Sequence, residues 1–314
     1  MTLPAFLQQA PPTVAVDIAP GRVAVTRLDR RGGGYVVGGY AVESLPDGAV
    51  SGQLGAPNMT DLRAVAAAVE RACTAAGARG ARVCVVVPDS IARVSIVHFD
   101  NVPARAADLD ELIRWQVKKT TPFPLDEAVV AATPGAAGGS GRDFVVTVAR
   151  RDVVEQYEDA CRRAGCQAGV VDLATFNVIN TVLVGERATH GDWLLVHATP
   201  TYVSLAVLRD GELIFYRTRG EDAEGSIADL VHQTAMYYED RLQGRRFGRV
   251  LLAGGSTHDG ADALRRELSD RLGLEVGAVD PFAAAALTGG RGSAELADTL
   301  AAGVGLVVRE GVGG

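Results

Sequence analysis

One pattern of apolar and polar positions occurs twice in this chain of 314 residues, over residues 14–28 and again over residues 194–208. Each copy begins with a short apolar run, passes through a tight polar turn, and continues as a segment that alternates apolar and polar residues. Such alternation predicts a half-buried β-strand. A third strand follows each copy, after the glycines that end at Gly34 and after Asp210-Gly211, which are residues that hairpin turns favour. A duplicated strand–turn–strand unit predicts two similar halves.

Helical spacing and buried strands follow between and after the two copies. Asp61 precedes apolar residues that recur three and four positions apart as far as Cys73, which predicts a helix with Asp61 at its N-cap. The apolar run at 82–87 predicts a buried strand that Pro88 ends. Further strands are expected near residues 92–99, 127–132, 143–149, 167–172 and 249–253, and further helices near residues 108–119, 152–164, 175–184, 226–242, 261–272 and 294–308. The glycine-rich residues 134–141 predict a flexible surface loop.

The order of these elements predicts an α/β protein with a duplicated, actin-like fold and one inserted subdomain. A meander of strands, a helix and a strand occur in both halves, and a block of strands and helices near 91–165 interrupts the repeat. We expect an N-terminal extension over 1–12, a first actin-like half over 13–90, 166–190 and 291–314, the inserted subdomain over 91–165, and a second half over 191–290.

Composition and charge narrow the function classes. A hydrophobic content of 47% is enough for a large core, and a net charge of −7 argues against nucleic-acid binding, which normally needs a basic face. No stretch approaches the roughly 18 apolar residues of a membrane span. Residues 1–12 lack the basic and apolar regions of a secretory signal, so a cytoplasmic protein is expected.

Candidate metal and catalytic chemistry is sparse. The four cysteines show no metal-ligand spacing and are expected to be reduced, buried thiols. The five histidines form no zinc-binding helix pattern. Lys118 and Lys119 are the only lysines, which leaves little room for lysine-based catalysis. We therefore assign no catalytic residue and no metal ligand.

The segment from Leu112 to Val129, with Trp115 and the Pro-Phe-Pro run at 122–124, resembles the helix–PFP–strand segment of the PilM family. These proteins are the FtsA-related cytoplasmic components of type IV pilus assembly. Residues 38–50, 148–154, 169–178 and 251–256 resemble further family segments in the family's order, so that the resemblance extends over about residues 13–309. It implies an actin-like, ribonuclease H-like duplicated fold with an inserted αβ subdomain of the FtsA/PilM type.

The resemblance also shows what this chain lacks at the turns that grip nucleotide phosphates. At the first turn Asp17 is present, but Ala19 and Ala24 replace the family's glycine and lysine, and Pro20 removes a backbone donor. At the second turn His197 stands where the family has the carboxylate expected to hold a metal-bound water, and Tyr202 adds bulk.

If Mg-ATP is bound at all, the resemblance implies a specific set of residues. These candidates are Asp17, Gly21, Thr199, Thr201, Gly254, Gly255 and Ser256. Structural alternatives stay open: Asp17 as a strand-end carboxylate that accepts turn N–H bonds, Gly254-Gly255 as a tight strand-to-helix turn, and His197 as a hydrogen-bonded strand-end histidine. We expect no ATP hydrolysis, and weak or absent ATP binding.

The function implied is a non-catalytic scaffold at the cytoplasmic face of the inner membrane. It would bind the N-terminal tail of a PilN-like membrane protein in a cleft bounded by the 82–100 strands and the 108–119 helix, and self-association is a further expectation. Candidate partner-binding residues are Ile113, Trp115, Lys118, Lys119 and Phe123, although Trp115 and Phe123 also suit packing roles. The alternatives are an active ATPase or sugar-kinase-like enzyme, and the cytoplasmic domain of a GspL-like type II secretion protein, which normally continues into a transmembrane helix.

Overall fold

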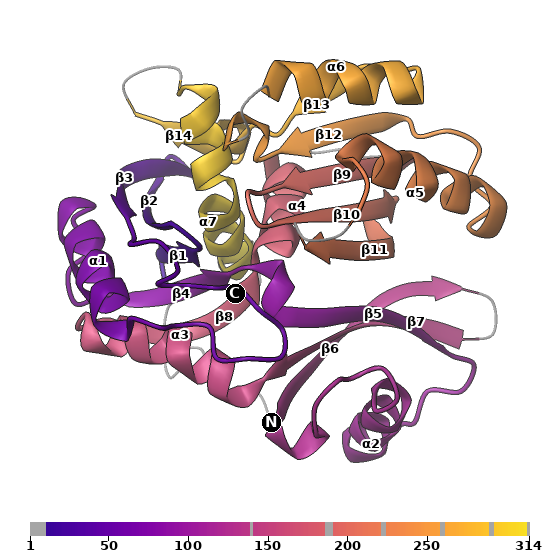
Figure 1. Cartoon of the computed structure of the whole chain (residues 1–314), viewed down its shortest axis with the longest axis horizontal. Helices are drawn as coiled ribbons and strands as arrows, with labels where there is room; N and C mark the ends of the chain where they lie inside the picture. Colours follow the sequence, from indigo (N-terminus) through magenta and orange to yellow (C-terminus); the bar gives the residue numbers. More distant parts are fainter. Residues whose placement is uncertain are drawn as a thin grey trace.

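The computed structural model describes residues 11–138, 141–185, 191–220, 224–257, 261–288 and 292–312. Most of the expected N-terminal extension, residues 1–10, lies outside these ranges. The described strands form three sheets, two of which carry the repeated meander (Figure 1). Within the described ranges, no helix combines the length and apolar character needed to cross a bilayer.

The first sheet has six strands in the order β14-β3-β2-β1-β4-β8. They are β1 (Val14–Ala19), β2 (Arg22–Arg31), β3 (Gly34–Ser44), β4 (Arg82–Val87), β8 (Gln167–Leu173) and β14 (Ala285–Leu287). The β1–β2–β3 meander is antiparallel, and β4 pairs with β1 in parallel. The continuous apolar run of β4 is buried after its first residue, as expected for a central parallel strand.

The second sheet repeats this arrangement in the order β11-β10-β9-β12-β13. Its strands are β9 (Asp192–Ala198), β10 (Tyr202–Arg209), β11 (Glu212–Gly220), β12 (Arg249–Ala253) and β13 (Val276–Ala278). As β4 pairs with β1, so β12 pairs in parallel with β9. The two sheets therefore confirm the duplication that the sequence predicts.

Helices α4 (Ala174–Gly185) and α7 (Ala294–Val312) lie between the two sheets, in the centre of Figure 1. Their apolar residues join cores with strands of both halves. The outer face of the first sheet is covered by α1 (Leu62–Ala75) and α3 (Arg151–Arg163), and that of the second by α5 (Ile227–Arg241) and α6 (Ala261–Leu272). As predicted, Asp61 caps α1: its side chain accepts the backbone N–H of Ala64 at 2.9 Å.

The inserted subdomain, at the lower right of Figure 1, has its own small sheet and core. Strands β5 (Ala92–Phe99), β6 (Ala128–Gly138) and β7 (Gly141–Arg150) are arranged in the order β5-β7-β6. Helix α2 (Ala106–Val117) packs on one face of this sheet, with Ile113 and Val117 buried against Phe144 and Val146. Short 3₁₀ helices, η2 (Asp89–Ile91) and η3 (Leu125–Glu127), precede β5 and β6.

Three details differ from the sequence expectations. Residues 285–287 were expected in the second half, with no strand predicted there, but they form β14, which pairs in parallel with β3 of the first sheet. Helix α3 was expected in the insert, but Val153, Tyr157 and Cys161 bury their side chains in the core of the first sheet. Residues 134–141 continue the β6–β7 hairpin on both sides of residues 139–140, which lie outside the described ranges. We therefore propose the same division into two halves and an insert, with β14 and α3 moved to the first half.

The tight packing of α7 against α4 at Gly305 can be tested by substitution. A Cβ atom at Gly305 of α7 would overlap the backbone carbonyl of Asn177 in α4, which cannot move without disturbing its helix. Although alanine favours a helix by up to about 1 kcal/mol over glycine, overpacking of this kind costs about 1–3 kcal/mol or more. We expect Gly305→Ala to lower the free energy of unfolding, measured with urea. Gly55→Ala, where a Cβ meets no atom within 4 Å, is the control and should leave it unchanged; an unchanged Gly305→Ala would contradict the packing.

Candidate functional site

The two hairpin turns meet at a cavity of about 230 Å³ between the halves. Five of the seven residues predicted to hold a nucleotide line this cavity: Asp17, Gly21, Thr199, Thr201 and Gly254. The other two, Gly255 and Ser256, line an adjoining hollow. Each turn follows the first strand of its meander, β1 or β9. These strands are in equivalent positions in the two sheets, each paired in parallel with β4 or β12. The site therefore forms where the sequence predicts it.

The carboxylate of the first turn already has a cation beside it. Asp17 is buried, and its Oδ2 accepts a hydrogen bond from Nη2 of Arg22 at 2.9 Å. Arg22 begins β2 opposite Ala19, so the two-residue turn places its guanidinium over Asp17. Neither expectation for Asp17, turn N–H bonds or Mg²⁺, included this ion pair. The signal available in the sequence was an arginine next to the turn, at the start of the antiparallel partner strand.

The second turn is closed by hydrogen bonds within itself. The N–H and the hydroxyl of Thr199 both donate to the carbonyl of Tyr202 at 2.9 Å, and the N–H of Tyr202 donates to Thr199 Oγ1 at 3.1 Å. The ring of Tyr202 is buried edge-on against His197, with centroids 5.9 Å apart. Burial raises the pKa of the Tyr202 hydroxyl well above its usual value. Tyr202 thus fills space inside the turn, as its bulk predicted.

The glycine turn after β12 is occupied by a carboxylate of the chain itself. Asp298 of α7 accepts the N–H of Gly254 through Oδ1 at 2.8 Å, and the N–H of Ser256 through Oδ2 at 2.8 Å. The hydroxyl of Ser256 donates to the same Oδ2 at 2.5 Å. Gly254 has a φ of +74°, and a Cβ there would overlap the carbonyl of Ala198, so this turn requires glycine. The donors that would face a ligand are bonded to Asp298.

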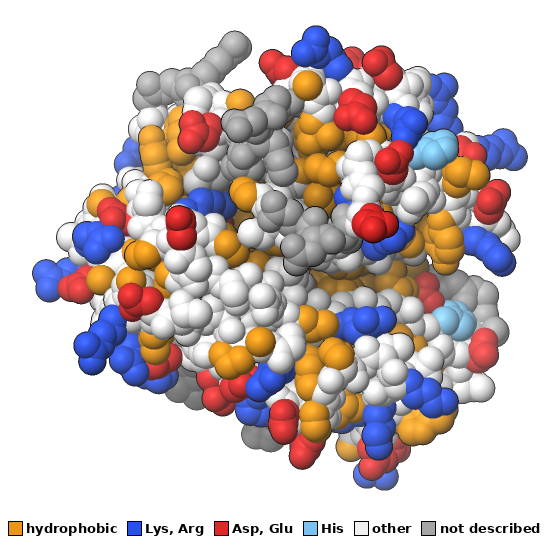
Figure 2. Space-filling model, in the orientation of Figure 1, with side chains coloured by type: hydrophobic (Ala, Val, Ile, Leu, Met, Phe, Trp, Pro, Cys, Tyr) orange, Lys and Arg blue, Asp and Glu red, His pale blue; other side chains and the backbone are white. Residues whose placement is uncertain are grey.

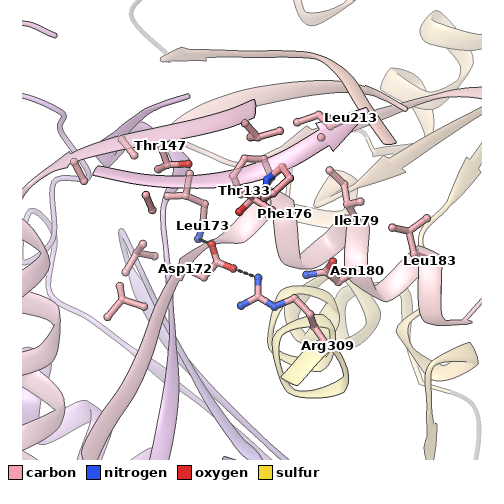
Figure 3. Close-up of a pocket in the computed structure, with 18 of the residues that line it drawn as sticks. Thr133, Thr147, Asp172, Leu173, Phe176, Ile179, Asn180, Leu183, Leu213 and Arg309 are labelled. Carbon is pink, nitrogen blue, oxygen red and sulfur yellow. Dashed lines mark hydrogen bonds and ion pairs between the residues drawn. The ribbon is translucent and has the colours of Figure 1, made fainter. Parts of the chain in front are cut away.

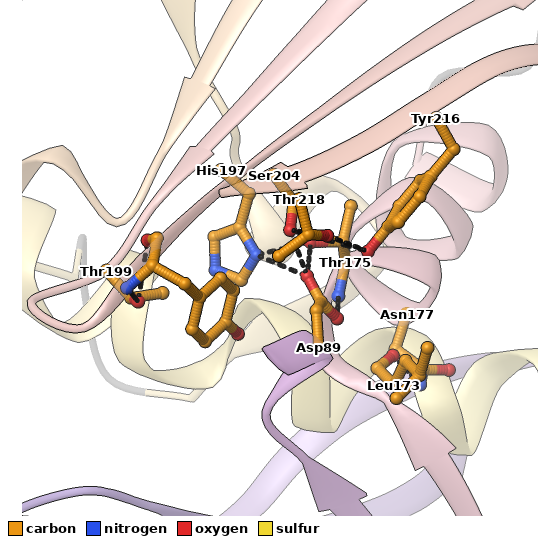
Figure 4. A network of polar contacts seen from close by, with 10 residues as sticks. Asp89, Leu173, Thr175, Asn177, His197, Thr199, Ser204, Tyr216 and Thr218 are labelled. Carbon is orange, nitrogen blue, oxygen red and sulfur yellow. Dashed lines mark hydrogen bonds and ion pairs between the residues drawn. The ribbon is translucent and has the colours of Figure 1, made fainter. Parts of the chain in front are cut away.

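Below the cavity, one buried carboxylate joins the two halves (Figure 4). Asp89, in η2 of the first half, is fully buried and accepts hydrogen bonds from the backbone N–H and the hydroxyl of Thr175, where α4 begins. It also accepts the hydroxyl of Ser204, in β10 of the second half, at 2.6 Å. The network continues from Ser204 to Thr218 at 2.9 Å. Sequence analysis missed Asp89, although a carboxylate two residues after the end of the buried strand β4 was a signal for it.

His197 belongs to this network and is not placed as a base. Its Nδ1 lies 2.7 Å from the hydroxyl of Thr175, which donates its one hydrogen to Asp89 and therefore accepts from the imidazole. Burial lowers the pKa of His197, so the ring is neutral at neutral pH. His197 is therefore a hydrogen-bonded histidine at the end of β9, which is one of the two roles considered from the sequence.

The residues at the turns do not fit a metal-bound nucleotide. The cavity is smaller than the roughly 300 Å³ at which ligand pockets begin. Its carboxylate is paired with Arg22, and Pro20 and Pro200 carry no N–H for a phosphate. Across the described ranges, His, Cys, Asp and Glu side chains form no group of three that would hold a metal ion.

A larger, mainly apolar cleft of about 390 Å³ lies between the first half and the insert (Figure 3), and the β10–β11 hairpin of the second half closes one side through Leu208 and Leu213. Alternate residues of β6 and β7 line one wall, because successive side chains of a strand point to opposite faces of the sheet. Phe176, Ile179 and Leu183 of α4 form the opposite wall. The polar groups in Figure 3 include the ion pair of Asp172 with Arg309 and the nearby amide of Asn180.

Of the two boundaries expected for the partner cleft, the 82–100 segment borders this cleft through Val87, Ile91 and Ala92, but α2 does not. Val129, Val145 and Thr147 face the cleft, whereas their neighbours in β6 and β7 face α2. Helix α2 therefore covers the opposite face of the sheet and does not border the cleft. Both faces of β7 are apolar, and the sequence does not reveal which face a helix covers.

The expected partner residues separate into two groups. Ile113 is buried in the core of the insert, and Phe123 packs against that core, so neither is free to bind a partner through its full side chain. Trp115 is 64% exposed, which contradicts a packing role, and the ammonium of Lys119 lies 6.0 Å from the centre of its ring. Trp115 and Lys118 border a shallow hollow on α2, away from the apolar cleft.

The Asp89 network yields a stability test. In Asp89→Asn, one acceptor oxygen becomes an amide donor facing hydroxyl and N–H groups, and a buried group left without its partner costs about 1–3 kcal/mol. We expect the free energy of unfolding to fall by about this amount in urea titrations, with less cooperative unfolding of the two halves. The exposed Asp126→Asn is the matched control and should match the parent chain. Equal stability of both variants would show that Asp89 does not join the halves.

Comparison with known proteins identifies the family to which this chain belongs. The sequence matches the family described as type IV pilus assembly protein PilM over residues 15–222. The structure is similar to that of a PilM-PilN type IV pilus biogenesis complex, with a TM-score of 0.81 and 16% identity over 95% of this chain and 98% of that one. It is also similar to a Bacteroides thetaiotaomicron protein with an actin-like ATPase fold and unknown function, with a TM-score of 0.52 and 9% identity over 88% of this chain and 94% of that one. Because the family match covers more than half of the chain, this protein belongs to the PilM family of type IV pilus assembly proteins and has its actin-like fold.

Proposed function

We propose that this chain is a non-catalytic scaffold of a type IV pilus assembly platform, and that it holds an extended cytoplasmic segment of a PilN-like membrane protein. The observation that carries the proposal is the apolar cleft between the first half and the insert. Through such a partner the protein would lie at the cytoplasmic face of the inner membrane.

The shape of the cleft suits an extended apolar peptide. One wall is a β-sheet face with side chains at alternate positions, Val129, Ala131 and Thr133 along β6. Strand β6 is also an edge of its sheet, so its backbone offers hydrogen bonds to an added strand. An extended segment would gain main-chain hydrogen bonds along β6 and place every second side chain against α4.

The partner's identity is extended from the similar structure, which is described as a PilM-PilN complex. The polar groups of the cleft would fix the register of the peptide, because a buried donor or acceptor without a partner is costly. These groups are Asn180, the Asp172–Arg309 pair, Thr133, Thr147 and Glu212.

The non-catalytic part of the proposal is supported by the turns. Arg22 takes the place of a cation at Asp17, Asp298 takes the place of an anion at Gly254 and Ser256, and Tyr202 fills the second turn. Catalysis of phosphoryl transfer depends on donors and metal ions aimed at the phosphates, and a single lost donor of this type costs about 3–4 kcal/mol in a transition state. An active ATPase needs groups that these contacts occupy. A GspL-like secretion domain remains the alternative within the same fold.

The cleft predicts the effect of a single charge. Ala131→Glu places a carboxylate on the cleft wall, and we expect at least a ten-fold weaker binding of a peptide from the PilN-like partner's N-terminal tail, measured by calorimetry. Ala132→Glu is the matched control: it is the next residue of β6, points to the other face, and is also exposed, so it should bind as the parent does. Equal weakening by both variants would contradict the assignment of the cleft.

Trp115→Ala distinguishes the cleft from the hollow on α2. If the cleft holds the partner, this variant binds the peptide with unchanged affinity. A ten-fold loss in Trp115→Ala together with normal binding by Ala131→Glu would move the partner site to α2, where Trp115, Lys118 and Lys119 were expected to act.

The occupied turns predict the behaviour toward nucleotide. With Mg-ATP we expect no phosphate release above the buffer rate, and no binding heat at micromolar concentrations. If the parent chain releases phosphate and Asp17→Ala does not, the chain is an ATPase and the prediction is wrong. A micromolar binding constant for Mg-ATP in calorimetry would overturn the binding half of the prediction.

A further inference from the structure

A second, polar cavity of about 580 Å³ lies between the second half and the insert. Its walls come from the start of β5, from the last residues of β11, and from residues 51–54 after β3. Figure 2 shows the hollow between these two parts of the molecule, above the insert. Its volume is within the roughly 300–1,000 Å³ of small-molecule sites.

Two arginines line this cavity with no side-chain partner among the residues that the structure describes. The side chains of Arg93 in β5 and Arg217 in β11 make no hydrogen bond or ion pair with any described residue, whereas those of Arg22, Arg150 and Arg209 each pair with a carboxylate. The described lining of the cavity contains no Asp or Glu. In a chain with a net charge of −7, a cavity lined by two unpaired guanidiniums concentrates positive potential.

Hydroxyl groups complete the lining. The Oγ of Ser90, another lining residue, is buried and has no hydrogen-bond partner among the described residues, which is rare for a buried hydroxyl. Thr201 and Thr218 line the same cavity. A guanidinium provides five N–H donors and a hydroxyl one, so the cavity offers more donors than the two oxygens of a carboxylate can accept. A phosphate, with more oxygens and more charge, matches this set better.

We propose that this arginine cavity binds a small molecule carrying phosphate groups, held between Arg93 and Arg217 with Ser90 beside it. Because Arg93 is in the insert and Arg217 in the second half, the ligand would bridge the two parts. This site is distinct from the hairpin turns, with which it shares only Thr201, and the proposal does not depend on the partner cleft.

Inorganic pyrophosphate is the probe, titrated into the full chain by calorimetry. The parent chain should bind it, Arg93→Ala and Arg217→Ala should each weaken binding at least ten-fold, and Arg93→Lys, which keeps the charge but loses the planar fork, should weaken it less. Arg63→Ala is the matched control, because Arg63 is an exposed arginine on α1, away from the cavity. It should bind as the parent does, and circular dichroism should show that all variants fold.

Three results would overturn the proposal. The parent chain failing to bind pyrophosphate is the first. Equal weakening by Arg63→Ala and the cavity variants is the second, because it would show general charge attraction. Binding of oligoglutamate in place of pyrophosphate is the third, and it would assign the cavity to an acidic peptide.

Discussion

The architecture depends on one buried carboxylate shared by the two halves. Asp89 lies shortly after β4 in the first half. It accepts hydrogen bonds from Thr175 at the start of α4 and from Ser204 in the second half. A buried carboxylate is tolerated only when its oxygens are hydrogen-bonded, so a movement that breaks the Ser204 bond while Asp89 stays buried leaves the carboxylate with too few donors. Thr175 of the first half and Ser204 of the second half are therefore held on the same carboxylate.

At the hairpin turns, too, polar groups are satisfied by other side chains of the same protein. An actin-like turn presents N–H groups and a carboxylate for a ligand, and here the chain supplies its own counterparts, Arg22 to Asp17 and Asp298 to Gly254. These contacts satisfy groups that would otherwise be buried without partners. The two binding sites that we propose lie elsewhere, in an apolar cleft and an arginine-lined cavity that both border the insert.

Much of the fold could be predicted from the sequence, because strand alternation, turn residues and helix caps are local signals. The duplicated meander, the Asp61 cap and the buried run of β4 are examples. The site could be predicted only in part. The turns were located correctly, but Asp298 is 44 residues from Gly254, and no local pattern indicates that the two meet. Residues 285–287, which form β14, and helix α3 were assigned to the wrong neighbours for the same reason, since burial partners are set by the path of the chain in space. Helix α2 was expected to border the cleft but covers the opposite face of the insert's sheet, and because β7 is apolar on both faces the sequence could not tell which face the helix covers.

The central claim is that the scaffold is held in its binding form by its own side chains and needs no nucleotide. The most direct measurement is the affinity of the PilN-like tail peptide for the full chain, by calorimetry, without nucleotide and with saturating Mg-ATP. The account predicts the same dissociation constant in both conditions, because Asp89, Arg22 and Asp298 already make the contacts that hold the halves and close the turns. A change of ten-fold or more on adding Mg-ATP, or binding only in its presence, would contradict it.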